Sequence, residues 1–183
     1  MKQIIGISGS LRKGSFNTTL LQTADAFFPK ESPLIIISLE GIPLYNDDLA
    51  RGAVPESVIE FRKIIENCAG VLIATPEYNY SMSGVLKNAL DWATTNVLSN
   101  VFDGKATAIM GASKTIFGTV RSQLHLRQVL MAAKAIVVQH PEVHVRKTHT
   151  IIDEKGILTD GYTQEKIQQL VGSLLEMISH SQN

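Results

Sequence analysis

The residues best suited to chemistry lie in a polar loop between an apolar run and a helical pattern. Residues 71–74 form an apolar run that is short enough, and rich enough in branched side chains, to be a buried strand. Apolar residues from 85 to 93 recur at the spacing of one helix face. The loop between them reads T-P-E-Y-N-Y-S-M-S-G. It offers the rings of Tyr78 and Tyr80, several hydrogen-bonding groups, and Gly84, where backbone can approach a ligand closely. In an open α/β sheet, ligands bind at such a loop, and this one suits a flat polar ring; the alternative is an ordinary loop whose serine caps the next helix.

A second polar loop follows the first isoleucine-rich run of the chain. Residues 8–17 contain two glycines, three serines, Arg12 and Asn17. Backbone N–H groups at a helix start favour a phosphate dianion, and Arg12 can pair with it through charge-assisted hydrogen bonds. The alternative is that Ser15 and Asn17 only cap the helix, but a cap does not explain Arg12. We therefore predict an anion site.

Other phosphate chemistries fit this loop less well. Gly9 and Gly14 have the Walker spacing, but the two residues that follow are not Lys and Ser/Thr. Gly6, Gly9 and Gly14 also lack the spacing of the dinucleotide fingerprint. Cys68 closes an apolar helix face and is interpreted as a core residue, not as a phosphatase nucleophile. The remaining interpretation is a site that binds a monophosphate without hydrolysing it.

Strand and helix patterns alternate around these loops. Strands are expected at residues 4–7, 33–39, 71–74, 105–110 and 135–138, with a short extension at 143–145. Helices are expected at residues 20–28, 55–68, 85–93, 119–133 and 167–178, with long loops at 40–54, 111–118 and 153–161. This alternation predicts a flavodoxin-like three-layer α/β fold with a five-stranded parallel sheet in the order 2-1-3-4-5. We expect one domain over residues 1–183.

The composition is that of a globular chain without a strong electrostatic field. Of 183 residues, 44% are hydrophobic and 19% charged, and 17 basic residues balance 17 acidic ones. This balance gives no sign of nucleic-acid or membrane-surface binding. The single cysteine excludes an intramolecular disulfide, and no run has the length of a secretory or membrane segment. These features predict a cytoplasmic protein.

With both loops in view, the chain resembles the NADPH-dependent FMN reductase family, whose members include quinone, azo-dye and chromate reductases. The first two matching motifs are G-S-L-R-K-G-S-F-N at 9–17 and T-P-E-Y-N-Y-S-M-S-G-V-L-K-N-A-L-D-W at 75–92. Two more are G-T-V-R-S-Q-L-H-L-R at 118–127 and D-E-K-G-I-L-T-D at 153–160. The resemblance implies a flavodoxin-like fold, bound FMN, NADPH or NADH as co-substrate, and a homodimer, possibly a tetramer.

The resemblance also assigns roles by position. The residues implied to hold the FMN phosphate are Ser10, Arg12, Ser15 and Asn17. Those implied to line the isoalloxazine ring, largely through main-chain atoms, are Pro76, Glu77, Tyr78 and Asn79. The segment implied to close the far side of the ring runs from Ser113 to Gly118. In that segment Phe117 replaces a glycine that relatives often have, which changes the shape expected for substrate access.

The resemblance implies further that Tyr45, Asn46 and Asp47 reach the flavin of a partner subunit. Arg121, His125 and Arg127 lie on a predicted helix that is either a solvated face or part of a subunit interface. His140, His144 and His149 are interpreted as surface histidines on an edge strand, and no metal is expected.

The expected reaction carries hydride from NAD(P)H through FMN to a small acceptor, such as a quinone, an azo dye, free flavin or a metal oxyanion. One stacking surface that serves both substrates predicts ping-pong kinetics, and no catalytic side chain is required. Glu77 is interpreted as a residue that caps or shapes the loop, not as a catalytic acid. The alternatives are a flavodoxin-type electron carrier, which would usually have a strong net charge, and a scaffold without flavin.

Overall fold

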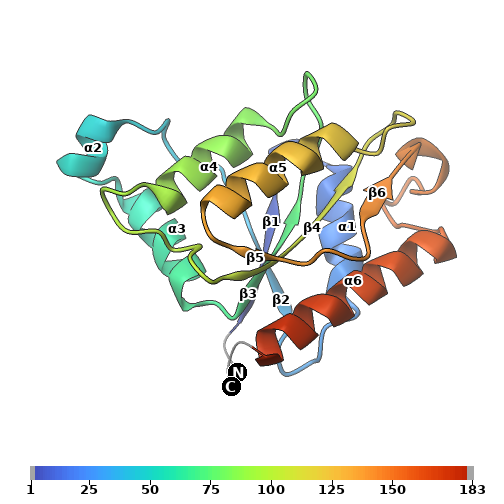
Figure 1. Ribbon diagram of the computed structural model, residues 1–183. Helices are drawn as coiled ribbons and strands as arrows, with labels where there is room; N and C mark the ends of the chain where they lie inside the picture. The colour runs from blue at the N-terminus through green and yellow to red at the C-terminus, as the bar shows by residue number, and fades with distance from the viewer. Residues whose placement is uncertain (1–2, 181–183) are drawn as a thin grey trace.

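The computed structural model describes residues 3–180 as an α/β structure built on one parallel sheet (Figure 1). The five main strands are β1 (Ile4–Ser8), β2 (Leu34–Ile37), β3 (Gly70–Ala74), β4 (Ala106–Ala112) and β5 (Ile136–Val137). Their order is β2-β1-β3-β4-β5, which confirms the predicted order. A sixth strand, β6 (Val143–Val145), pairs with the end of β4 beyond β5. The predicted extension at 143–145 is therefore part of the sheet. Residues 1–2 and 181–183 of the predicted domain lie outside the described residues.

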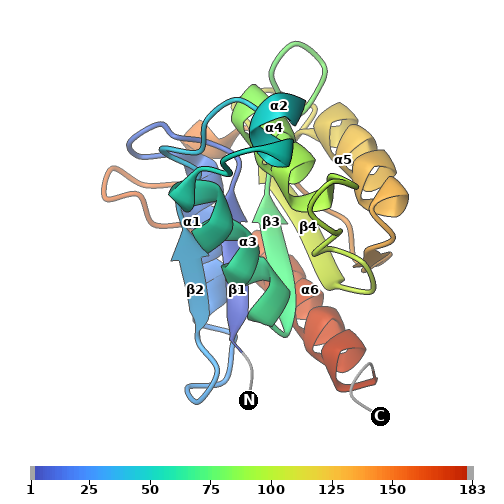
Figure 2. The ribbon, with the colours of Figure 1, turned by 90° about the vertical axis from the view of Figure 1, so that its left-hand side faces the viewer.

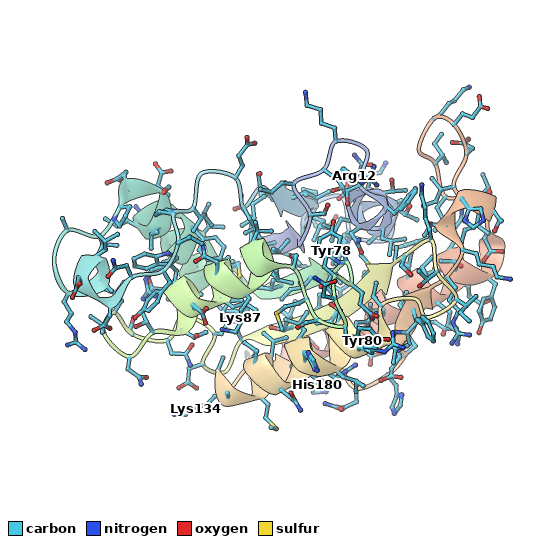
Figure 3. All side chains as sticks on the ribbon, turned by 90° about the horizontal axis from the view of Figure 1, so that it is seen from above. Arg12, Tyr78, Tyr80, Lys87, Lys134 and His180 are labelled. Atoms are coloured by element: carbon cyan, nitrogen blue, oxygen red, sulfur yellow. The ribbon has the colours of Figure 1, made fainter. Side chains whose placement is uncertain are left out.

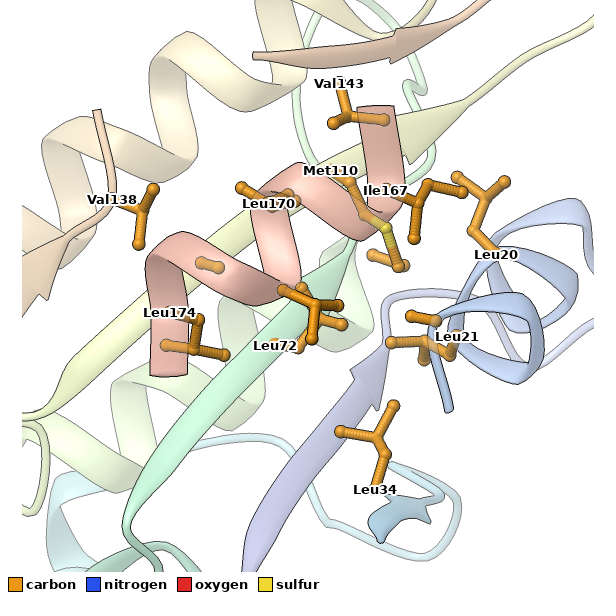
Figure 4. Packing of buried hydrophobic residues seen from close by; sticks show 14 of the residues in the cluster. Leu20, Leu21, Leu34, Leu72, Met110, Val138, Val143, Ile167, Leu170 and Leu174 are labelled. Atoms are coloured by element: carbon orange, nitrogen blue, oxygen red, sulfur yellow. The ribbon is translucent and has the colours of Figure 1, made fainter. Parts of the chain in front are cut away.

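Helices cover both faces of the sheet (Figures 1 and 2). On one face lie α1 (Phe16–Asp25) and α6 (Gly161–His180), and on the other α3 (Glu56–Asn67), α4 (Gly84–Thr94) and α5 (Val120–Ala132). β1, β3 and β4 are buried along their whole length, as expected for apolar strands between two helix layers. Figure 4 shows leucines of α1 and α6 packed on Leu72 and Met110 of the sheet. The three-layer prediction is confirmed.

Two short elements appear that the sequence did not predict. α2 (Asp47–Arg51) lies within the loop expected at 40–54, and a 3-10 turn covers Thr148–Thr150. Asn46 caps α2 by accepting a hydrogen bond from the N–H group of Asp48 at 2.8 Å. An Asp47–Arg51 ion pair at 2.6 Å links the two ends of this single turn. The capping asparagine and this charge pair were the available sequence signals.

The apolar residues singled out in the sequence lie inside the structure. Cys68 is buried at the end of α3, and Trp92 is fully buried in α4. Pro55 precedes α3 as its cap residue, whereas the sequence placed it as the first helical residue. None of the helices within residues 3–180 is both long enough and apolar enough to cross a membrane.

Candidate functional site

Three polar loops leave the sheet at the same edge. Ser8 and Ala74, the last residues of β1 and β3, lie in register with Met110 near the carboxyl end of β4, which ends two residues later at Ala112. A cavity of about 220 Å³ lies between the loops that follow. Its lining residues are Ser10, Arg12, Ser15, Phe16, Asn17, Pro76, Glu77, Tyr78, Ala112, Ser113, Lys114 and Thr115. Figure 3 shows Arg12 and Tyr78 close together when this edge is viewed from above. The structure thus brings together all the predicted cofactor residues except Asn79 and Gly118.

The β1–α1 loop presents donors that its own fold leaves free. Ser10 Oγ and Ser15 Oγ each accept a backbone hydrogen bond, at 3.3 Å from Arg12 N and Asn17 N, so each hydroxyl keeps its own proton to donate. Gly14 has a φ of +66°, a left-handed conformation that glycine adopts readily in tight turns. Within residues 3–180, the structure shows no acceptor for the N–H groups of Ser15 and Phe16. This loop can hold an anion without breaking an existing contact.

Two cations lie beside the phenyl ring of Phe16 in this cavity. The Arg12 guanidinium lies 5.1 Å from the ring centroid, and the Lys114 ammonium lies 5.8 Å from it. Arg12 is exposed, and its guanidinium donates to the carbonyl of Lys13 at 3.2 Å. In the described part of the chain, neither Arg12 nor Lys114 has a carboxylate within 4.0 Å. The cavity therefore has a local positive charge although the chain has no net charge.

The side chain of Asn17 is occupied by the protein itself. Its Oδ1 accepts from Ala112 N at 2.9 Å, and its Nδ2 donates to Ala112 O at 3.3 Å. These bonds join the start of α1 to the end of β4. The sequence could not show this contact because the partner is 95 residues away. A direct phosphate contact by Asn17 stays a prediction.

Glu77 caps a helix that belongs to another loop. Its carboxylate accepts from the N–H groups of Arg121 at 3.0 Å and Ser122 at 3.3 Å, and from Arg121 Nη1 at 2.9 Å. The cap residue of α5, Thr119, makes no side-chain capping bond, so Glu77 replaces a local cap. Its capping role, interpreted from the sequence, is confirmed.

Three hydroxyl groups fix the β3–α4 loop to its neighbours. Ser122 Oγ donates to the carbonyl of Pro76 at 2.7 Å and lies 2.8 Å from Thr75 Oγ1. Ser83 Oγ caps α4 and donates to the carbonyl of Gly9 at 2.5 Å. The serine cap that the sequence left as an alternative is therefore present. It coexists with a cavity-lining loop and also ties that loop to the β1–α1 loop.

A tight turn projects from the β3–α4 loop. Tyr78 and Ser81 exchange two backbone hydrogen bonds, at 2.9 and 3.0 Å. Asn79 and Tyr80 between them have φ values of 48° and 68°, the pattern of a type I′ turn. Asn79 thus lies at a turn tip and not in the cavity. Non-glycine residues in this conformation cost roughly 1–3 kcal/mol each and tend to occur at functional sites.

Arg121 stabilises this turn from α5. Its guanidinium lies 4.2 Å from the ring centroid of Tyr80 and 4.2 Å from that of Phe117, while it also pairs with Glu77. Cation–π contacts of this kind contribute about 0.5–2 kcal/mol each. Phe117, which departs from the family pattern, is 46% exposed. Its exposed ring contacts Arg121 at the rim of the site.

Two predicted glycines have different structural roles. Gly118 lies outside the cavity with a φ of +59°, and a β-carbon there would lie 2.9 Å from the backbone of His144. It is required for close packing of the β4–α5 loop on β6. A β-carbon on Gly84 would meet nothing within 4 Å. No part of the described chain therefore packs closely against Gly84, and the backbone approach to a ligand expected there stays a prediction.

The segment predicted to reach a partner's flavin is fixed to α4. The Tyr45 ring packs edge-on against Trp92 with centroids 4.9 Å apart, and Tyr45 N donates to Asn88 Oδ1 at 2.7 Å. Asn46 and Asp47 belong to the cap and first turn of α2. Figure 3 shows this segment well away from Arg12 and Tyr78 of the same chain. Contact with a partner's flavin stays a prediction.

The histidines do not gather into a metal site. Among residues 3–180, no three His, Cys, Asp or Glu side chains are placed to hold one ion. His140 is exposed, as predicted. The side chain of His144 is only 18% exposed, and its Nε2 lies 3.3 Å from Glu142. His144 is therefore partly exposed and more enclosed than His140, on a strand that pairs with β4 and whose neighbouring Val143 and Val145 are buried.

Comparison with known proteins assigns the chain to a family. Residues 2–150 match the family described as NADPH-dependent FMN reductase. An NAD(P)H-dependent FMN reductase of Pseudomonas aeruginosa is 44% identical over 172 residues, which cover 94% of this chain and 92% of that protein. A 2-hydroxy-1,4-benzoquinone reductase of a Burkholderia species is 36% identical over 166 residues, covering 91% and 90%.

A solved structure is similar over almost the whole chain. It is FerB, a flavoenzyme NAD(P)H:(acceptor) oxidoreductase from Paracoccus denitrificans, with 32% identity, 98% coverage of both chains and a TM-score of 0.88. Together with the sequence matches, this similarity confirms the resemblance drawn from the motifs. The chain belongs to the NADPH-dependent FMN reductase family and is an oxidoreductase enzyme.

Proposed function

We propose that this enzyme binds FMN between its three loops and reduces a small acceptor of the quinone class with NAD(P)H. The observation that carries the proposal is the cavity between the β1–α1, β3–α4 and β4–α5 loops. One wall of it has free hydroxyl protons, free N–H groups and two cations, the donor set that a terminal phosphate requires. When bound, FMN supplies the hydride chemistry between the nicotinamide and the acceptor.

The phosphate end of FMN is assigned to the β1–α1 loop. Ser10 and Ser15 would donate their hydroxyl protons, and Arg12 would supply a charge-assisted hydrogen bond. Asn17 would act mainly by holding this loop against Ala112. These residues bind and orient the cofactor and take no part in proton transfer.

The ring end is assigned to the other two loops. Pro76, Glu77 and Tyr78 would contribute backbone groups and the tyrosine ring on one side, and Ser113 would contribute from the other. Asn79 and Gly118 would shape the turn and the loop that border the ring. Glu77 cannot serve readily as a proton donor, because its carboxylate accepts three hydrogen bonds from the start of α5. We therefore assign no side chain as a general acid or base.

One open stacking surface is proposed to serve both substrates in turn. The nicotinamide would leave before the acceptor binds, which gives ping-pong kinetics. The Burkholderia relative is named a benzoquinone reductase, and this supports a quinone as the acceptor. A quinone is flat, so the protein needs to supply only a stacking surface for it.

We propose that the enzyme works as a homodimer. Tyr80, Leu124 and Met131 border one exposed hollow along α5 and are 67%, 53% and 73% exposed. Apolar side chains gathered in this way favour association with another protein surface. In such a dimer, the segment from Tyr45 to Asp47 would approach the flavin of the partner. Light scattering coupled to size-exclusion chromatography would measure the mass, and a monomer at micromolar concentration would contradict the proposal.

An anaerobic titration tests the main proposal. Protein reconstituted with FMN should lose its yellow colour when NADPH is added and regain it when benzoquinone is added. NADPH and quinone should be consumed in equal amounts over many cycles. Protein that binds FMN but does not oxidise NADPH or NADH would instead be an electron carrier, and protein that takes up no FMN would exclude both functions.

A further inference from the structure

A second hollow lies on the far side of the β4–α5 loop. Its volume is about 730 Å³. Residues from three segments line it: Ile116 of the β4–α5 loop, Arg146 and Lys147 after β6, and Tyr162 and Lys166 of α6. Figure 1 shows these three segments together beside β6. We call this hollow the α6 groove.

The α6 groove and the proposed FMN cavity share a wall. Lys147 N donates to Thr115 O at 3.1 Å, and Thr148 N donates to Ser113 O at 3.2 Å. Ser113 and Thr115 line the FMN cavity, whereas Lys147 lines the groove. Chains hydrogen-bonded in this way run about 5 Å apart. A ligand that extends from the flavin ring over this loop would therefore enter the groove.

Two cations of the groove, Arg146 and Lys147, are unpaired among the described residues, whereas Lys166 donates to Gln169 Oε1 at 3.3 Å and the carboxylates of the groove are engaged. In the described part of the chain, the side chains of Arg146 and Lys147 make no hydrogen bond and no ion pair. Asp160 accepts from Thr163 Oγ1 at 2.6 Å and Thr163 N at 2.8 Å, and these bonds hold the pKa of its carboxyl below the ordinary value. Glu142 lies 3.3 Å from His144 Nε2. The groove therefore offers unpaired positive charge to an anion.

Two further features favour a ligand in the groove. Lys147 has a φ of 45°, a left-handed conformation that is unusual for a lysine and that occurs preferentially at ligand-binding positions. The ring of Tyr162 is 70% exposed and lies 5.7 Å from Lys166 Nζ. An exposed ring with a cation over one face can stack its other face on a flat heterocycle such as adenine.

We propose that Arg146 and Lys147 bind the 2′-phosphate of NADPH, with Tyr162 and Lys166 beside its adenosine. The inference rests on the proposed function, because the nicotinamide must then lie over the flavin ring on the other side of the shared loop. A phosphate dianion pairs well with an arginine fork and a lysine ammonium. NADH lacks this phosphate, so the groove determines the preference for NADPH.

Binding of adenosine fragments tests this inference without any redox reaction. Calorimetric titration of the FMN-loaded protein should show 2′,5′-ADP binding at least about tenfold more tightly than 5′-AMP. Arg146→Gln and Lys147→Gln should each remove most of this difference. Lys155→Gln is the matched control, because Lys155 is exposed in the neighbouring turn and does not line the groove. This control should bind 2′,5′-ADP like the unmodified protein.

Steady-state kinetics provides the second measurement. Arg146→Gln should raise the KM for NADPH roughly tenfold relative to the KM for NADH.

Equal binding of 2′,5′-ADP and 5′-AMP by the unmodified protein would overturn the inference. Inorganic phosphate that binds as tightly as 2′,5′-ADP would also overturn it, because the groove would then be a general anion site. If NADPH and NADH both drive quinone reduction in these cases, only the groove assignment fails. Absence of turnover with either nucleotide would refute the proposed function itself.

Discussion

The β1–α1 loop and the β3–α4 loop lie side by side at the same sheet edge but use their polar groups in opposite ways. In the β1–α1 loop, Ser10 and Ser15 keep donor protons, and the guanidinium of Arg12 makes one exposed hydrogen bond, to Lys13 O. In the β3–α4 loop, Glu77 and Ser83 are fully engaged with α5 and with Gly9. The first loop keeps its donors for a ligand, whereas the second uses its side chains to hold its own backbone.

The difference follows from what each end of the proposed ligand needs. A phosphate dianion needs several donors and positive charge, so free side chains are useful there. A flat ring needs a surface of fixed shape, so the side chains beside it are best used to fix the backbone. Substitutions in the β3–α4 loop should therefore lower stability, and substitutions in the β1–α1 loop should lower affinity for FMN.

The largest expected effect comes from Glu77→Ala. It removes a helix cap and leaves Arg121 without its carboxylate, so we expect the free energy of unfolding to fall by about 3 kcal/mol. Urea denaturation of the FMN-free protein measures this change. The control is Glu142→Ala, which removes an exposed carboxylate 3.9 Å from Arg127 and should cost less than about 1 kcal/mol. Equal losses in both variants would show that Glu77 does not fix the loop.

Arg12→Ala should have its effect on binding instead. Loss of one charge-assisted hydrogen bond should weaken FMN binding by about 2 kcal/mol, or roughly 30-fold. The free energy of unfolding without FMN should change little, because Arg12 contacts only Lys13 and Phe16. Fluorescence titration with FMN measures the affinity. Lys13→Ala, which removes an equal charge from an exposed residue outside the cavity, is the control. Equal FMN affinity in the Arg12 variant and the unmodified protein would refute the phosphate assignment.

Asp160 provides a local cap to compare with the long-range cap of Glu77. Asp160→Ala should cost about 1 kcal/mol, because the residue caps α6 from its own chain neighbour. Its hydrogen bonds with Thr163 lower the pKa of the carboxyl in the folded state. The stabilisation is therefore complete above the ordinary carboxyl pKa of about 3.9 and is lost as the pH falls through the lower folded-state pKa.

Thermal melts from pH 6 to pH 2 would follow this loss. The unmodified protein and Asp160→Ala should differ at about pH 6 and converge at the acid end. Asp160→Asn, which retains a capping oxygen, should lie between them at high pH. A difference that grows as the pH falls would contradict the capping role.

The smallest expected effect on stability comes from Gly84, at the exposed start of α4. A β-carbon there meets nothing within 4 Å, so Gly84→Ala should change the free energy of unfolding by less than about 1 kcal/mol. Gly84→Val should also fold, and its larger side chain should lower the affinity for FMN. If Gly84→Val also lowered the free energy of unfolding, the position would instead matter for folding. Full flavin content and activity in that variant would show that the glycine is incidental to the site.

Local patterns were sufficient to predict the sheet order and most of the elements. Apolar runs and helix periodicity identify β1, β3 and β4 because strands buried on both faces must be apolar along their whole length. The sequence could also mark the predicted anion-binding loop through Ser15 and the glycines around it, since helix caps and left-handed turns are local features. α2 was missed because a single capped turn has almost no periodicity to detect.

The sequence alone therefore determined the layers, the sheet edge and the residue types of the site. The tertiary structure decided how those residues are used: Asn17 bonds Ala112, Glu77 caps α5, and Lys147 borders a groove beside the shared loop. Each of these contacts joins residues far apart along the chain. Hydrogen bonding over such separations depends on how strands and helices pack, and periodicity within a short window carries no information about it.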